Sequence, residues 1–110
     1  MSAPPSRSAA PAAFHLGAGH VIVHGNPEFL EAFGQASVGL PAREAMLPLP
    51  AKAFELMDLV YRTGKPGACR VTTTLGPRRL VVVARVDPET DEIYGVTTHI
   101  RPLATDASER

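Results

Sequence analysis

Residues 50–66 read PAKAFELMDLVYRTGKP, and this stretch has the longest helical pattern in the chain. The spacing of Asp58 and Arg62, one turn apart, predicts a favourable pair. Apolar side chains fill most of the circumference, so we expect the helix to pack deeply against a sheet. Pro50 suits a first turn, and Gly64 followed by Pro66 ends the helix. Four charged side chains recur at steps of three and four and share one solvated stripe: Lys52, Glu55, Asp58 and Arg62.

The residues after this helix have strand patterns. Residues 68–75, 79–86 and 93–101 are rich in β-branched side chains, with Gly76-Pro77 and the acidic segment 87–92 as turns. Three consecutive strands with short connections indicate an antiparallel sheet. The segment 87–92 lacks the glycine and the ligand spacing of a calcium loop, so it is interpreted as a solvated turn.

The residues before the helix contain two further strand patterns, at 12–16 and 20–24. Asn26 caps a helix that begins at Pro27, and residues 41–46 predict another helical turn. Because all helices come between the second and third strands, we expect them on one side of the sheet. The predicted fold is α+β, a five-stranded antiparallel sheet with short helices and one longer helix on one face. Both faces of the strand around Val82 are apolar, so a second copy or a partner domain is expected over the other face.

Length and composition indicate one domain at residues 12–102, with a disordered tail at 1–11 and a flexible tail at 103–110. The 11 basic and 11 acidic residues are interspersed, which argues against a nucleic-acid-binding or membrane-surface protein. The single cysteine, Cys69, excludes an internal disulfide and fits a reducing compartment. The sequence has no signal-peptide pattern and no run long enough to span a bilayer, so a cytoplasmic location is expected.

Four segments in this order resemble the PAS domain, and the resemblance covers residues 12–102. They are Gly25-Asn26-Pro27-Glu28-Phe29, Phe33-Gly34, the helix exit Tyr61-Arg62-Thr63-Gly64-Lys65-Pro66, and the hairpin around Asp87-Pro88 that leads to Ile93-Tyr94-Gly95-Val96. The chain is similar to PAS modules of bacterial signalling kinases and serine phosphatases. The resemblance implies a sensory or interaction module and not an enzyme. It would act as a homodimer or on a kinase or phosphatase partner, tuned by a small ligand.

The resemblance also implies two sites. A pocket between helices and sheet would hold a ligand, or its apolar side chains would fill that space entirely. The pocket candidates are Phe29, Phe33, Met46, Phe54, Met57, Tyr61, Thr97 and His99. The outer sheet face would carry the partner. Val82 is expected on that face, and Val83 would take its place if the two faces of the strand are reversed. The interface candidates are Leu80, Val82, Ala84, Tyr94, Val96 and Ile100.

Cofactors are not identified by the sequence. No Asn-Cys-Arg-Phe type motif stands between residues 34 and 50, which argues against a flavin adduct, and residues 54–62 contain no histidine to bind haem. A metal site would need three of His15, His20, His24 and His99 to converge, and structural or exposed roles are favoured for them. Cys69 lies near Lys65 and Arg70, which would favour a thiolate if it were exposed, although a buried thiol is the favoured reading. The alternative function is a metabolite-binding protein or enzyme that uses His99, Tyr61 and Cys69.

Overall fold

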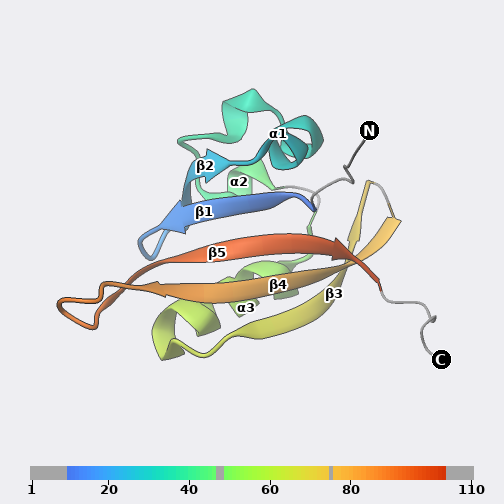
Figure 1. The fold of residues 1–110 in the computed structure, drawn as a ribbon. Helices are drawn as coiled ribbons and strands as arrows, with labels where there is room; N and C mark the ends of the chain where they lie inside the picture. The colour runs from blue at the N-terminus through green and yellow to red at the C-terminus, as the bar shows by residue number, and fades with distance from the viewer. Residues whose placement is uncertain (1–9, 47–48, 75, 104–110) are drawn as a thin grey trace, which may run out of the picture.

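The computed structural model describes residues 10–46, 49–74 and 76–103. Its five strands lie in the order β2-β1-β5-β4-β3, and every neighbouring pair is antiparallel (Figure 1). The strands are β1 (Ala12–Leu16), β2 (Val21–Gly25), β3 (Gly67–Thr73), β4 (Gly76–Val86) and β5 (Ile93–Pro102). The helices are α1 (Pro27–Phe33), the 3-10 turn η1 (Gln35–Ser37), α2 (Ala42–Ala45) and α3 (Ala51–Thr63). The predicted α+β class and sheet are confirmed, while most of the two predicted tails, at 1–9 and 104–110, lies outside the described residues.

Asn26 fixes the junction between β2 and α1. Its side-chain oxygen accepts hydrogen bonds from the backbone N–H groups of Phe29 and Ala12, each at 2.9 Å. Its Nδ2 donates to the carbonyl of Ala10, also at 2.9 Å. The predicted cap is therefore present, and the same side chain also ties the start of β1 to the start of α1.

Helix α3 packs across β3, β4 and β5 and closes the core on one side of the sheet. Its deeply buried side chains are Ala53, Phe54, Met57 and Val60. Opposite them lie Leu80 and Val82, both fully buried. Each such aliphatic side chain contributes about 1.5–3 kcal/mol through burial. Gly64 ends the helix with a φ of 78°, and its N–H donates to the carbonyl of Val60 at 2.8 Å.

Two local predictions are wrong. Gly76 and Pro77 belong to β4 and not to a turn, because Pro77 lies near the start of its strand, where a missing N–H is tolerated. His20 leaves the second strand and occupies the preceding turn with a left-handed φ of 54°. Its side chain therefore does not share a strand face with His24, which is exposed.

The two edges of the sheet differ. Segment 39–42 runs beside β2: the Ile22 N–H donates to the carbonyl of Leu40 at 3.0 Å, and the Gly39 N–H donates to the carbonyl of Ile22 at 2.7 Å. A bridge between Val21 and Pro41 extends this cover. At the other edge, β3 pairs only with β4 among the described residues.

Candidate functional site

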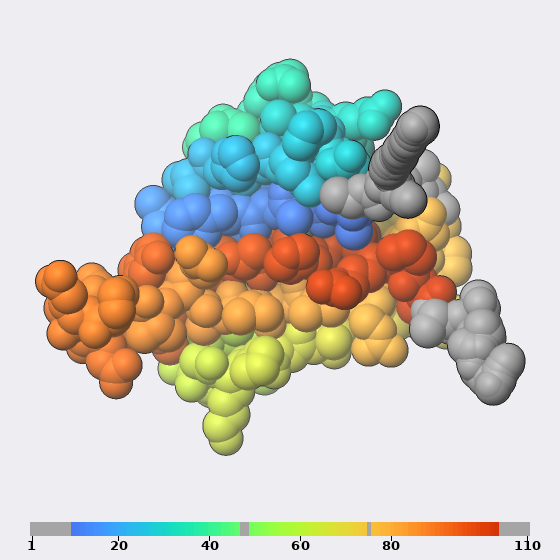
Figure 2. Space-filling view, in the orientation of Figure 1, coloured from blue at the N-terminus to red at the C-terminus, as the bar shows by residue number. Residues whose placement is uncertain are grey.

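The outer face of the sheet is the side that the described helices leave open. In Figure 2, β1, β5 and β4 form a continuous surface toward the viewer with no helix in front of them. Val83 is 41% exposed and lies opposite Thr97, which in turn lies opposite Phe14. The Phe14 ring contacts Tyr94 edge-on at a centroid distance of 6.0 Å, and the Arg85 guanidinium lies 5.4 Å from its centre. This face therefore combines an apolar centre with charged side chains around it.

The predicted interface residues lie mostly on the inner face of the sheet, which packs against the helices, and not on the outer face. Leu80, Val82 and Val96 are 0% exposed and Ile100 is 4% exposed, because all four point toward the helices. Ala84 packs partly buried against the same core, and of this set only Tyr94 is exposed. Residues that alternate with them form the outer face instead. Both faces of β4 are apolar, so its hydrophobic pattern did not distinguish them.

Thr97 and His99 were predicted to face a pocket and instead lie on the outer face. They alternate with the buried Thr98, and His99 lies opposite Ala12 and Val81. Partial burial lowers the pKa of His99, and the positive charge of Arg101 lowers it further. His15 lies on the inner face beside Thr98, so it does not converge with His99.

Charges on the outer face are separated along the strands. Arg70 of β3 lies opposite Arg79 of β4, which lies opposite Arg101 of β5. These three exposed side chains form what we call the arginine row. No described acidic side chain forms an ion pair with them. At the other end of β4 and β5, the connecting turn carries what we call the acidic hairpin: Asp87, Glu89, Asp91 and Glu92.

A series of hydrogen-bonded polar groups, which we call the polar chain, begins on the inner face with His15, Thr98 and His20. The sequence did not predict it. His15 is 0% exposed; its Nδ1–H donates to the carbonyl of His20 at 3.3 Å, and its Nε2 accepts from the Thr98 hydroxyl at 2.8 Å. The pKa of His15 is lowered from 6.5 to about 4. Burial is the main cause and the nearby His20 ring adds to it, while the hydrogen bond to the His20 carbonyl opposes it. The imidazole is therefore neutral near pH 7 and joins β1 to β5.

The polar chain continues to the helices through His20. Its Nε2 donates to the Asp58 carboxylate of α3 at 2.6 Å, and Arg43 donates to the other carboxylate oxygen at 2.9 Å. Burial raises the pKa of Asp58, but the hydrogen bonds from Arg43 and His20 outweigh this and hold that pKa below its usual value. Asp58 therefore pairs with His20 and Arg43, whereas the sequence predicted a pair with Arg62.

The Nδ1 atom of His20 is buried and has no hydrogen-bond partner among the described residues. The Tyr61 ring packs edge-on against the imidazole at a centroid distance of 5.9 Å. No group of three or more His, Cys, Asp or Glu in the described part of the chain is arranged to hold a metal ion. The sequence carries no local signal for the contacts of the polar chain, because Thr98 stands beside an identical residue, Thr97.

The aromatic and methionine pocket candidates lie together in the core. Phe29, Met46 and Met57 are 0% exposed and Phe54 is 5% exposed, with Phe33 and Tyr61 packed partly buried against them. A cavity among them stays a prediction. Cys69 is half-buried on β3; burial raises the pKa of its thiol, which Lys52 offsets only in part. The thiol is therefore protonated near pH 7, and the thiolate favoured for an exposed side chain is absent.

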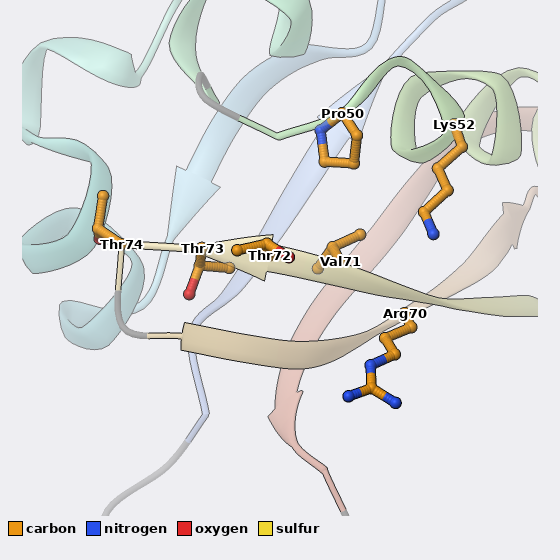
Figure 3. A pocket seen from close by; sticks show the side chains of 7 residues that line it. All are labelled: Pro50, Lys52, Arg70, Val71, Thr72, Thr73 and Thr74. Carbon is orange, nitrogen blue, oxygen red and sulfur yellow. The ribbon is translucent and has the colours of Figure 1, made fainter.

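Two surface hollows lie away from these candidates. One, of about 440 Å³, lies beside the acidic hairpin and Tyr94. The other, of about 510 Å³, follows the free edge of β3. Figure 3 shows Lys52 on the helix side of this strand and Arg70 on the opposite side. The lining residues of the second hollow are Pro50, Lys52, Arg70, Val71, Thr72, Thr73 and Thr74.

Comparison with known proteins identifies the fold. A scan against protein-family models and a search of curated protein sequences returned no match. Among solved structures, the PAS domain of the histidine kinase ThkA superposes with a TM-score of 0.68 at 15% identity, covering 86% of this chain and 99% of that domain. The light-oxygen-voltage domain of the blue-light photoreceptor Aureochrome1 gives a TM-score of 0.67 at 12% identity, covering 92% of this chain and 87% of that one.

The VqmA dimer of Vibrio cholerae, in a structure determined in the absence of its target DNA, matches with a TM-score of 0.67 at 17% identity. That alignment covers 86% of this chain but 46% of VqmA, so the chain spans about half the length of that protein. The superpositions show that the chain has the PAS fold. Among the described helices, none is both long and apolar enough to cross a membrane.

Proposed function

We propose that this PAS-fold domain is a signalling module that acts by protein contact through its outer sheet face. The observation that carries the proposal is the apolar centre of that face, where Val83 and Tyr94 are 41% and 39% exposed beside Phe14. The described helices all serve the opposite face. A large apolar patch on the open side of a sheet is typical of a surface that contacts another protein.

Val83→Asp tests this proposal. A carboxylate in the centre of the patch would have to be desolvated in any complex, so we expect association to be lost while the domain stays folded. The measurement is the molar mass by light scattering after size exclusion, with circular dichroism as the check of folding. Leu59→Asp is the matched control, because Leu59 is 45% exposed on α3. Unchanged association of a folded Val83→Asp protein would contradict the proposal.

A small ligand in the interior is the second part of the proposal. The buried His20 Nδ1 without a described partner supports it, because a buried polar atom is normally hydrogen-bonded. A ligand that bridges this atom and Tyr61 would contact the same imidazole that is hydrogen-bonded to Asp58, and so would be linked to α3. Native mass spectrometry of freshly purified protein, with an absorbance scan, tests this: a retained mass lost in His20→Phe is expected, and a bare chain would count against it.

The alternative of an enzyme site built from His99, Tyr61 and Cys69 is not retained. His99 lies on the outer face, whereas Tyr61 lies on α3 and packs toward the core. The sheet therefore separates the two side chains. The matched segments are the PAS domain of one histidine kinase, the sensor region of another and a light-oxygen-voltage domain.

A further inference from the structure

We propose that the partner of the outer sheet face is a second copy of this chain, bound with its strands antiparallel. In that arrangement the arginine row of each copy faces the acidic hairpin of the other. The inference rests on the proposed function and adds the identity and orientation of the partner.

The arginine row carries the first argument. Arg70, Arg79 and Arg101 lie directly opposite one another on three neighbouring strands. Like charges in opposite positions on a sheet destabilise it. Because no described acidic side chain forms an ion pair with them, the row presents an unbalanced positive charge that suits an acidic surface.

The acidic hairpin supplies such a surface on the same molecule. It holds four carboxylates within the six residues 87–92, and the exposed Glu89 and Glu92 form no ion pair with a described basic residue. Row and hairpin lie at opposite ends of β4 and β5, so they cannot neutralise each other within one copy. With 11 basic and 11 acidic residues, the chain as a whole is neutral. The outer face is therefore a charge dipole, which a copy turned end to end complements.

Strand positions place the symmetry axis. Arg79 precedes Val83 by four residues, and Asp87, the first residue after β4, follows Val83 by four, so each lies about 13 Å from Val83 along the strand direction. On β5, Arg101 follows Thr97 by four residues, while Glu92 precedes it by five. Val83, Thr97 and Phe14 lie opposite one another across three strands. A two-fold axis along this line superposes the row of one copy on the hairpin of the other.

The apolar side chains lie where this axis requires them. Val83 would meet its own counterpart at the centre, where water is excluded, with Phe14 beside it under the Arg85 guanidinium and the arginine row and acidic hairpin at the rim. Arg85, the positive side chain nearest the hairpin, is engaged over the Phe14 ring at 5.4 Å. A parallel pair would bring the two arginine rows together and is electrostatically unfavourable.

Charge reversal tests the orientation on the full chain. The row-reversed variant is Arg79→Glu with Arg101→Glu, and the hairpin-reversed variant is Glu89→Arg with Glu92→Arg. All four side chains are exposed, so folding should be unaffected. We expect each variant alone to weaken self-association by about tenfold or more at low salt, because like charges then face each other. A matched control is Lys52→Glu with Lys65→Glu, two exposed charges away from the outer face.

Rescue is the decisive observation. An equimolar mixture of the two variants should form a heterodimer of near wild-type affinity, and all four substitutions in one chain should restore the homodimer. Analytical ultracentrifugation at two salt concentrations measures both. A dimer that Val83→Asp disrupts but the reversals leave unchanged or strengthen would overturn the antiparallel inference and leave the proposed contact face intact. A wild-type chain that stays monomeric would overturn the second copy as the partner, with the contact face then tested against acidic partner proteins.

Discussion

The two faces of the sheet are built from the same strands and yet have opposite properties. The inner face contains Leu80, Val82 and Val96, which are all fully buried. It also contains the hydrogen bond between His15 and Thr98, which links β1 to β5. The outer face, offset by one residue, carries Val83 and Thr97 beside charged side chains. A valine or threonine thus lies in the core or on the outer face according to its parity along the strand. The comparison shows that parity, and not residue type, assigns the roles here.

The largest expected contrast is between two adjacent valines. Val82→Asp places an unpaired carboxylate in the core and should lower the free energy of unfolding by about 3–5 kcal/mol. Val83→Asp should lower it by about 1 kcal/mol or less. Urea unfolding of the two variants at a concentration where both are monomeric measures the contrast. Equal losses would mean that the assignment of the two faces is wrong.

Acid should act on the inner face through His15. Its pKa is about 4 in the folded chain and 6.5 as an ordinary imidazole, so between these values only the unfolded state binds the proton. The free energy of unfolding should therefore fall by about 3 kcal/mol as the pH falls from 6.5 to 4. Chemical unfolding across this range, compared with His15→Gln and with the exposed His24→Gln as control, measures the effect. A difference between wild type and His15→Gln that does not change with pH would contradict it.

The adjacent threonines give a smaller contrast. Thr98→Val removes the hydroxyl that donates to His15 and leaves a buried nitrogen unpaired, which should cost about 1–3 kcal/mol. Thr97→Val, on the outer face, should change the free energy of unfolding by no more than about 0.5 kcal/mol. Thermal melts of the two variants provide the measurement. A larger loss for Thr97→Val would reverse the roles given to the two residues.

The smallest effect is expected where the polar chain reaches the surface. The side chain of Arg43 is 54% exposed, so Arg43→Gln should cost below about 1 kcal/mol, and added salt should reduce this difference. Asp58→Asn should cost more, because it also weakens the hydrogen bond to the buried His20. Denaturant unfolding at low and high salt separates the two. A salt-independent loss of several kcal/mol in Arg43→Gln would show that the pair is more buried in effect than its exposure indicates.

The order and nature of the elements could be predicted from the sequence because local signals specify them. Asn26 with Pro27 marks the start of α1, and Gly64 marks the end of α3. The faces of β4 and β5 could not, because residues 80–84 are apolar throughout and Thr97-Thr98 are identical neighbours. Parity there depends on contacts with distant elements. The PAS resemblance gave the fold class correctly but not the orientation of these side chains.

The polar chain escaped prediction for a related reason. The partners His15 and Thr98 are 83 residues apart, and Asp58 lies 38 residues after His20. No local spacing signals such a contact. His20 also needs its left-handed φ to turn inward, and a histidine after a glycine-rich turn gives no sign of that conformation. Asp58 had an equally good local partner in Arg62, which the structure does not use.

The unequal edges of the sheet limit how the domain can polymerise. Among the described residues, segment 39–42 pairs with the backbone groups of Ile22 in β2, whereas β3 has no strand on its far side, so strand addition is easier along β3. Growth of a fibril by edge-to-edge pairing needs two open edges per molecule. Two copies joined through β3 would use the open edge of both and stop there. This arrangement therefore disfavours filament growth by edge-to-edge strand pairing, while the β3 edge stays accessible.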